Sequence, residues 1–538
     1  MTGYKRFKDP VYGYIDIDRA IISNIVDTAA FQRLRNIIQT SYLPLYSSAV
    51  HNRFVHSLGV YYLGKIVIGA LSESKEEFND IVNLDRWLGI FQIACLLHDV
   101  GHAPFSHTGE EYYLENGKRA SLHNEIIELT KDKEMKDEIE NKNYKAAPHE
   151  LMSVIVALKE YGFLFENNEE KSFFARCITG YLYTKKTDLK YSFLNCLVSL
   201  LNSSVIDVDK LDYLIRDAYI TGFDTVIIDY KRLLESVKIV KQKDEYYLIY
   251  TKRAISVIEN VVYAHDAERK WIQNHPVVQY EGYLLKTLME ELIKKYINIK
   301  LFSYSALTEE GIKISSEYQI SLLCDADIIF LIKNLDISLR KEYFNRNVRR
   351  HPLWKSEAEY KAIFDIGYTD DILKIIEDGL EELCKYLNFV CKSQEINNNA
   401  LKACLKDIEN TEKLINSGNK EKIKSIIVKK KKQLKWLEVL KSFAESQEIK
   451  FDFVIVKAVQ FNSGFTKEAF EQIQIEFDTL KRPYYFGKVT NTLKANKSVR
   501  EKFFYLFYKR TNTDKKIDVR SLAIALGEIA IKELAENN

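Results

Sequence analysis

The sequence contains few of the residues that interrupt regular structure, with only 7 prolines and 20 glycines among 538 residues. Turn-rich all-β folds need more of both, so this scarcity predicts a mostly helical chain. The seven cysteines are odd in number and scattered, and no two of them have the CxxC spacing of redox or metal-binding pairs. They predict buried thiols in a reducing compartment rather than disulfides.

An excess of one charge is also missing, because 78 Lys and Arg residues face 76 Asp and Glu residues, a net charge of +2. This balance predicts no global attraction to nucleic acid or to anionic lipid. No apolar run reaches the ~18 residues of a membrane helix. The N-terminal MTGYKRFKDPVYGYIDID also lacks the apolar segment of a signal peptide. We therefore expect a cytoplasmic protein with no membrane contact.

Apolar residues recur at three and four positions through residues 1–300, for example in 31–39, 57–71 and 84–98, which predicts amphipathic helices. The clear interruption is VKIV and YYLIY around a polar turn, typical of a β-hairpin at 237–250. Helical periodicity continues through 301–395 as an extension of this core. The predicted fold class is therefore mainly α, with a helical core and a small hairpin.

The composition changes in the last part of the chain, residues 396–538. A Lys-rich segment with KKKK at 429–432 precedes two strand-like runs, FDFVIVKAV and QIQIEFD. This order predicts a smaller C-terminal α+β unit. The lysine run suits a nucleic-acid or acidic-ligand patch, but a solvated helix face is the interpretation that we favour.

Histidine is concentrated in one region, since seven of the ten lie between residues 51 and 149. At the centre, IACLLHDVGHAPFSH runs an apolar helix into His98 and Asp99. The pair can offer one nitrogen and one oxygen to the same divalent ion, a mixed set that suits Mn, Fe, Zn or Mg. His56 in HNRFVHSLGV offers a further ligand. A single histidine of this kind is usually a core residue, but the cluster favours a metal site.

About a hundred residues further on, SSVIDVDKLDYLIRDAY places Asp209, Tyr213 and Asp217 at i, i+4 and i+8 on one face of a predicted helix. Asp212 and Arg216 form an i, i+4 pair on a neighbouring face. The first face suits a nucleotide, with metal at one end, then phosphate, sugar and a hydroxyl group. An ordinary charged helix is the alternative.

In this order and spacing, HNRFVHSLGV, LLHDVGHAPFSH, PHELMSV and IDVDKLDYLIRDA resemble the HD-domain deoxynucleoside triphosphate triphosphohydrolases. This family includes the bacterial dGTPases and the SAM-and-HD-domain dNTPase of animals. FQRLRNIIQT is similar to an early helix of the family. The resemblance is strong up to Asp217, looser to about residue 390, and implies an HD-domain helical core. It also implies metal-dependent hydrolysis of dNTPs to deoxynucleoside and triphosphate.

The resemblance also implies roles for single residues. It makes metal ligands of His56, His98, Asp99 and Asp209. It places the substrate phosphates near Arg53, Lys210 and Glu150, the deoxyribose against Tyr213, and the 3′-hydroxyl between Asp217 and Gln39. His107 matches the catalytic histidine, with His102 beside it, Glu110 orienting its ring and His149 near the phosphates.

Two departures limit what the resemblance carries over. Thr40 follows Gln39 where the family has a bulky apolar residue, so base preference is not inherited. A basic residue of the family aligns to His265 or Trp271 here, which leaves the γ-phosphate contacts open. Members of the family are typically homo-oligomers with nucleotide effector sites at subunit contacts. We therefore expect a homo-oligomer, most simply a tetramer, under allosteric nucleotide control.

Two rival hypotheses remain. A different HD phosphohydrolase, acting on monophosphates, cyclic dinucleotides or nucleic-acid ends, would use the same metal chemistry. A nucleotide-sensing or nucleic-acid-binding protein without activity is supported only by the Lys-rich segment. The sugar-reading face of Tyr213 and Asp217 favours the dNTPase over the first rival, and the complete ligand set argues against the second.

Overall fold

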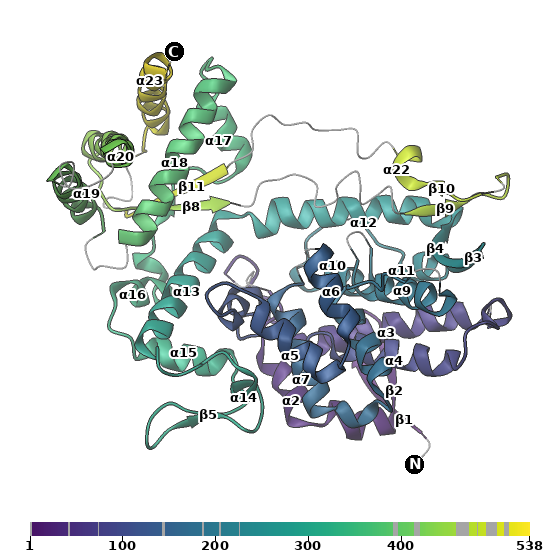
Figure 1. Ribbon diagram of the computed structural model, residues 1–538. Helices are drawn as coiled ribbons and strands as arrows, with labels where there is room; N and C mark the ends of the chain where they lie inside the picture. The colour runs from purple at the N-terminus through teal and green to yellow at the C-terminus, as the bar shows by residue number, and fades with distance from the viewer. Residues whose placement is uncertain are drawn as a thin grey trace. The chain divides into compact units, whose positions relative to one another are not determined.

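The computed structural model describes residues 3–40, 44–73, 75–142, 146–185, 188–203, 206–224, 226–390, 396–413, 420–458, 473–480, 482–490, 503–510 and 516–537. The chain is mainly α-helical with short strands, as the sequence predicted (Figure 1). It divides into two compact units. The first comprises Met1–Arg269, Met289–Asn334 and Asn462–Ala495, and the second Lys270–Leu288, Leu335–Phe461 and Asn496–Asn538. The domain boundaries expected near residues 300 and 395 stay predictions.

The first unit contains most of the helices. They are α1 (Arg19–Ile21), α2 (Ala29–Gln32), α3 (Arg53–Ser72), α4 (Leu84–Leu97), α5 (Ala120–Thr130), α6 (Lys133–Lys142), α7 (Pro148–Glu160), α8 (Asn168–Thr179), α9 (Leu189–Leu201), α10 (Val208–Thr221), α11 (Tyr230–Leu234), α12 (Ile255–Glu268), α14 (Tyr304–Leu307), α15 (Asp325–Lys333) and α22 (Phe486–Val489). Helix α3 packs against α4 and α10, and α7 packs against α5 and α8. These packed faces form the core around the candidate site.

Within the described residues, three small sheets belong to the first unit. β1 (Tyr4–Asp9) pairs with β2 (Gly13–Asp18), and β5 (Ile312–Lys313) pairs with β6 (Gln319–Ile320), both antiparallel. The predicted hairpin is β3 (Val237–Gln242) and β4 (Glu245–Thr251), with Val237 opposite Tyr250. β9 (Gln474–Glu476) joins β4 in parallel and β10 (Tyr484–Tyr485) completes the order β10-β9-β4-β3. A late segment of the chain thus extends an early hairpin.

The second unit is α+β. Its sheet has the order β7-β11-β8, from β7 (His351–Pro352), β11 (Phe503–Tyr508) and β8 (Phe453–Ala458), all antiparallel. Its helices are α16 (Ser338–Phe344), α17 (Glu357–Phe364), α18 (Asp370–Val390), α19 (Ile396–Lys413), α20 (Lys420–Ser446) and α23 (Val519–Asn537). α13 (Pro276–Lys295) begins in this unit and ends in the first.

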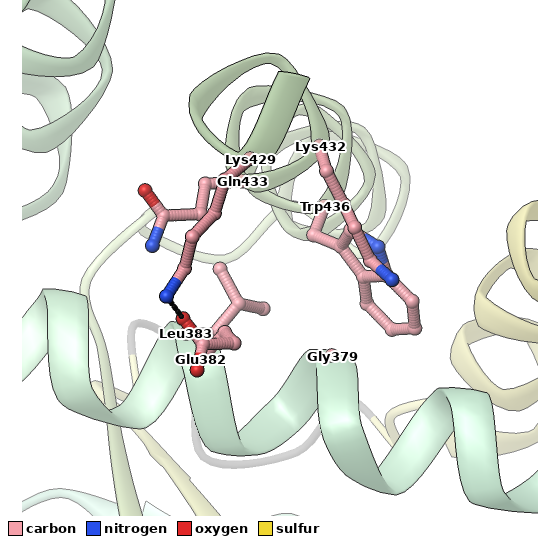
Figure 2. Close-up of a pocket in the computed structure, with 7 residues that line it drawn as sticks. All are labelled: Gly379, Glu382, Leu383, Lys429, Lys432, Gln433 and Trp436. Carbon is pink, nitrogen blue, oxygen red and sulfur yellow. Dashed lines mark ion pairs between the residues drawn. The ribbon is translucent and has the colours of Figure 1, made fainter. Parts of the chain in front are cut away.

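The second unit also accounts for the lysine run. Lys429, Lys430, Lys431 and Lys432 on α20 form ion pairs with Glu382, Asp407, Glu412 and Glu533, at 2.9, 3.3, 2.9 and 2.6 Å. Figure 2 shows the indole of Trp436 over Gly379 of α18, where a Cβ would lie 2.5 Å from the ring. This run is therefore a helix face paired with acidic neighbours, and both interpretations of it, the solvated face and the ligand patch, stay predictions.

Three local features of the described residues bear on the sequence-based expectations. The helix expected over 31–39 is wrong beyond Asn36, because α2 passes into a 3-10 turn and Ile37 is extended. By length and composition α3 is the one described helix able to cross a membrane, but 61% of its apolar window is buried. It is the central core helix and carries candidate site residues. Of the six described cysteines, all free, Cys324 alone is not buried, and Cys391 lies outside the described residues.

Candidate active site

The first group of candidate residues is brought together by three helices. Asn52 caps α3 by accepting from the backbone N–H of Val55, which fixes where the helix starts and turns His56 into the core with no exposed surface. His98 and Asp99 follow the end of apolar α4 and are also buried. Asp209 lies in the first turn of α10. Residues far apart in the sequence therefore converge on one point.

The four predicted metal ligands do meet. The Nε2 atoms of His56 and His98 are 3.2 Å apart, and Asp209 Oδ1 lies 3.0 Å from His56 Nε2 and 3.6 Å from His98 Nε2. Asp99 Oδ2 lies 3.6 Å from both imidazole nitrogens. His56, His98 and Asp99 offer atoms close enough to hold one ion.

The hydrogen bonds of the Nδ1 atoms of His56 and His98 indicate whether a cation can bind between the two rings. His98 Nδ1 donates to the carbonyl of Cys95 at 3.0 Å, and His56 Nδ1 donates to Asp212 Oδ2 at 2.8 Å. Because each Nδ1 is engaged in this way, each ring can bind a metal ion only through Nε2, and the two Nε2 atoms face each other. Two lone pairs and two carboxylates facing each other match a divalent ion with mixed nitrogen and oxygen ligands.

Electrostatics at this point also favour a cation. Burial by itself lowers the pKa of His56, but the carboxylates of Asp209 and Asp212 raise it to about 9. Burial raises the pKa of Asp99, and the charges of Arg53, His98 and His56 more than reverse this, so the pKa is lowered. The pKa of Asp209 is lowered in the same way by hydrogen bonds from the two histidines. The site is therefore built for ionised carboxylates.

A second histidine group adjoins the first. His102 stacks on His149 with ring centroids 4.2 Å apart, and His107 lies edge-on to both at 5.3 and 5.2 Å. Glu110 contacts His107 Nδ1 at 3.2 Å and forms a short contact with His149 Nδ1. His107 is the solvent-exposed histidine of this group, with 66% of its side chain exposed. The four predicted catalytic residues thus form one cluster.

The charges in this cluster are unequal. Burial and the surrounding cations lower the pKa of His102 well below its usual value. Burial alone lowers the pKa of His149 too, but the hydrogen bond and charge of Glu110 raise it to about 9. The pKa of Glu110 is lowered by both histidines, against its burial. A neutral ring is therefore stacked on a protonated one near neutral pH.

The predicted phosphate-binding residues are held by protein groups. Arg53 donates to Asp99 Oδ2 at 2.7 Å and to Ser106 Oγ at 3.0 Å. Lys210 Nζ contacts Asp207 Oδ2 at 2.5 Å and the carbonyl of Ser203 at 2.7 Å. Arg53 therefore binds a predicted metal ligand, and Lys210 binds the carboxylate two residues before another, Asp209.

Glu150, also predicted to lie near the phosphates, is hydrogen-bonded at the start of α7. Its Oε2 accepts from the backbone N–H of Ala147 at 2.6 Å and its Oε1 accepts from Asn202 at 2.8 Å, while burial raises its pKa. It therefore caps the start of α7 and positions His149 in the first turn, with both oxygens already engaged.

The predicted sugar-binding residues lie along and beside α10. Asp209, Tyr213 and Asp217 occupy one helix, as expected, with Asp217 buried. Asp217 Oδ1 contacts His51 Nε2 at 2.6 Å, and the backbone N–H of Gln39 donates to the carbonyl of His51 at 3.0 Å. Gln39 Oε1, Thr40 Oγ1 and His51 Nδ1 are buried with no partner among the described residues. These free polar atoms suit a ligand hydroxyl group.

The sequence did not assign functions to three residues that the geometry singles out. Asp212 supports His56, His51 supports Asp217, and Asp325 bonds the backbone N–H groups of Ile38 and Phe105. For Asp212 the i, i+4 pair with Arg216 was a visible signal. His51 was visible only as a member of the histidine cluster, and Asp325 carried no local signal.

Converging histidines and carboxylates in a helical core define a candidate metal-dependent hydrolase site. The HD domain family matches residues 53–173, which include both histidine groups.

Similar proteins extend this result. The chain is 33% identical over 268 residues to the deoxynucleoside triphosphate triphosphohydrolase SAMHD1 of Mus musculus, covering 47% of this chain and 38% of that protein. It is 30% identical over 267 residues to MG461 of Mycoplasma genitalium, 47% and 52% of the two chains. It is 27% identical over 366 residues to MJ1154 of Methanocaldococcus jannaschii, 68% and 61%. Both of these are described as uncharacterized. The matched region spans between 38% and 61% of the length of these relatives.

Proposed function

We propose that this protein hydrolyses deoxynucleoside triphosphates to deoxynucleoside and triphosphate. The observation that carries the proposal is the layout of α10, which runs from the metal cluster at Asp209 to the buried Asp217. Tyr213 lies between them, where a deoxyribose would pack. A general phosphatase has no need of a sugar site in line with the metal.

The ligand set for the ion is His56, His98, Asp99 and Asp209. Mn, Fe, Mg and Zn all accept such ligands, and the bound ion would polarise phosphate oxygens and lower the pKa of water. Arg53 and Lys210 add positive charge for the phosphates. Asp217, Gln39 and the support of His51 offer acceptors and donors for the 3′-hydroxyl.

The chemistry requires water to attack the α-phosphorus while the bond from that phosphorus to O5′ breaks. The oxygen of water remains on the triphosphate, and O5′ gains a proton and leaves as the nucleoside hydroxyl. His107 suits the role of proton donor, because its Nδ1 is oriented by Glu110 and its side chain is exposed. His149, held protonated by Glu110, adds charge beside the phosphates.

The proposal includes setting and control. From the resemblance of the sequence motifs to the dNTP triphosphohydrolase family, we infer a cytoplasmic enzyme of dNTP-pool control that assembles as a homo-oligomer, with a tetramer favoured, under a nucleotide effector. Depletion of dNTPs against phage is one biological use of such an activity. Ion pairing of the lysine run leaves nucleic acid as the weakest partner proposal.

One observation supports a second candidate, a two-ion HD phosphohydrolase acting on other nucleotides. His102, His107 and His149 offer three ligand atoms within reach of one ion. His102 Nε2 also lies 3.8 Å from Asp99 Oδ1, whose other oxygen faces the first group. Two-metal sites with ions ~3.5–4 Å apart are common in phosphoesterases. Two ions per chain would favour this candidate.

The test is to incubate the purified protein with each dNTP and rNTP plus Mn²⁺ or Mg²⁺ and to separate triphosphate from pyrophosphate and phosphate. We expect triphosphate and deoxynucleoside from dNTPs and little reaction with ribonucleotides. His107→Ala should lose turnover by ~10²–10⁴-fold and keep its metal, whereas Asp209→Ala should lose both.

Asp188→Ala is the control for these variants, because Asp188 caps α9 away from the cluster. It should keep both activity and bound metal. Release of pyrophosphate with a monophosphate, or equal kcat/KM for dATP and ATP, would contradict the proposal.

A further inference from the structure

The side chain of Asp325 connects two separate segments of the candidate active site. Asp325 begins α15, outside the matched HD domain, and its Oδ1 accepts from the backbone N–H of Phe105 at 2.7 Å. Its Oδ2 accepts from the backbone N–H of Ile38 at 2.8 Å. Phe105 lies two residues before His107, and Ile38 directly precedes Gln39. One carboxylate therefore holds two segments together. We call residues 105–107, which end at His107, the catalytic segment, and residues 38–39, which end at Gln39, the sugar-binding segment.

The catalytic segment needs such support because its backbone is strained. Phe105 and Ser106 have φ values of 58° and 53°, in the left-handed region that residues other than glycine rarely adopt. They lead into the 3-10 turn Ser106–Thr108, which carries His107. A strained turn persists where surrounding contacts over-determine it. The bond from Phe105 to Asp325 is such a contact at the first strained residue.

Other bonds join the same two segments. Ser106 Oγ donates to the carbonyl of Ile38, and Arg53 Nε donates to Ser106 Oγ at 3.0 Å. Arg33 donates to the carbonyl of Leu323 at 3.0 Å and to that of His102 at 2.8 Å. The loop before α15 is thereby fastened to the turn that follows the His–Asp pair. Asp325 completes this network from the side of α15.

Helix capping does not explain Asp325. The backbone N–H of Cys324 already donates to Asp327 Oδ2 at 2.9 Å, so the start of α15 is capped by a different carboxylate. Burial raises the pKa of Asp325 to about 6, against its two amide hydrogen bonds and the charges of Arg33 and Arg53. A carboxylate kept in a desolvated position without serving its own helix is typical of a functional role.

We propose that Asp325 is a positioning residue that sets the distance between the proton donor and the sugar-binding segment. This inference rests on the function proposed above. The hydrogen bonds of Asp325 go to the backbone N–H groups of Phe105 and Ile38, so it acts on the site through these two backbone positions. A residue outside the matched HD domain is thus required to hold the proton donor at the correct distance from the sugar-binding segment.

The test compares Asp325→Asn with Asp327→Asn in the full-length protein loaded with Mn²⁺. The asparagine at 325 keeps the shape and one acceptor oxygen but turns an amide N–H₂ toward one backbone N–H. Since misplacement by ~1 Å can cost ~10²-fold in rate, we expect kcat for dNTP hydrolysis to fall at least ~10-fold. Bound metal should not change. Asp327→Asn keeps an acceptor oxygen for the backbone N–H of Cys324 and should leave kcat within about twofold.

Hydrogen exchange supplies a readout that does not depend on activity. In Asp325→Asn the amide of Phe105 or of Ile38 should exchange at least ~10-fold faster, while the amides of α3 and α4 keep their protection. Unchanged kcat in Asp325→Asn, or an equal loss in Asp327→Asn, would overturn the inference.

Failure of the proposed function is a separate result. It would appear as absence of triphosphate release by the wild-type protein. Exchange at Phe105 and Ile38 would then still report on the connection, and unaltered exchange at both amides in Asp325→Asn would refute it.

Discussion

At the scale of single residues, the metal cluster depends on which nitrogen of His56 carries the proton. Asp212 Oδ2 accepts from His56 Nδ1 at 2.8 Å, and Arg216 binds both oxygens of Asp212 at 2.9 and 3.0 Å. Arg216 is in turn held by Asp9 at 2.9 Å. Arg216 lowers the pKa of Asp212 to about 2 despite burial, so this carboxylate is ionised at neutral pH. This buried network of Asp9, Arg216 and Asp212 orients the ring of His56 so that its Nε2 faces the other predicted metal ligands.

Asp212→Asn should therefore weaken metal binding, because an amide can turn its N–H₂ toward His56 and favour the wrong tautomer. Loss of such an outer partner typically costs ~10–100-fold in metal affinity. Competition with a fluorescent chelator, together with metal analysis of the purified protein, measures this change.

Glu170→Gln is the matched control, since Glu170 is a buried carboxylate paired with Arg86 away from the cluster. It should bind metal as the wild type does. Equal metal affinity in Asp212→Asn and wild type would show that Asp212 does not orient His56.

At the scale of elements, the turn after the His–Asp pair and helix α7 contact each other through their backbones. A Cβ on Gly101 would lie 2.4 Å from the carbonyl carbon of Met152 and from the nitrogen of Ser153. The backbone N–H of Gly101 donates to Ser153 Oγ at 3.0 Å. This close approach keeps His149, in the first turn of α7, stacked on His102. Glycine at this position therefore holds the second histidine group together.

Gly101→Ala should push α7 away from the turn and lower the free energy of unfolding by ~1–3 kcal/mol, as overpacking does. It should also reduce turnover, because the histidine group would be displaced. Urea unfolding and dNTP turnover measure the two effects.

Gly89→Ala, on α4, is the control, since nothing lies within 4 Å of its Cβ position. It should be neutral or stabilise by up to ~1 kcal/mol, because alanine is the better helix former. If the two alanine variants were equally stable and active, the close backbone contact would have no such role.

At the scale of the whole molecule, the predictions concern the oligomeric state and the regulation of activity by nucleotides. The full chain is needed to study them, since β9 and β10, from residues 474–485, belong to the same sheet as the hairpin β3–β4. A truncation near residue 398 would remove both strands from the first unit. It would therefore not isolate the role of the C-terminal part.

We predict that light scattering of the full chain detects a homo-oligomer, most simply four copies of the 62.8 kDa subunit, whose mass or activity responds to dNTPs. The reason is the resemblance to oligomeric dNTPases. Sigmoidal dependence of rate on nucleotide, measured in parallel, would support an effector site apart from the metal. A monomer with hyperbolic kinetics at every dNTP concentration would contradict this prediction.

The local parts of this site follow from short patterns in the sequence. His98 and Asp99 are adjacent, and the face of Asp209, Tyr213 and Asp217 follows from helical periodicity, so both were predicted correctly as local geometry. The hairpin at 237–250 and the mainly helical fold likewise follow from short patterns of polarity and turn residues. The family resemblance added which distant residues would meet the pair.

The supporting contacts depend on the packing of segments that are far apart in the sequence. His51 and Asp217 are 166 positions apart, and Phe105 and Asp325 are 220 apart. The pairing of β9 with β4 joins segments that are more distant still. No periodicity relates such residues, because the packing of whole helices determines which side chains meet. The same holds for Gly101. A side chain at this position is excluded only because the backbone of α7 packs against it in the folded protein.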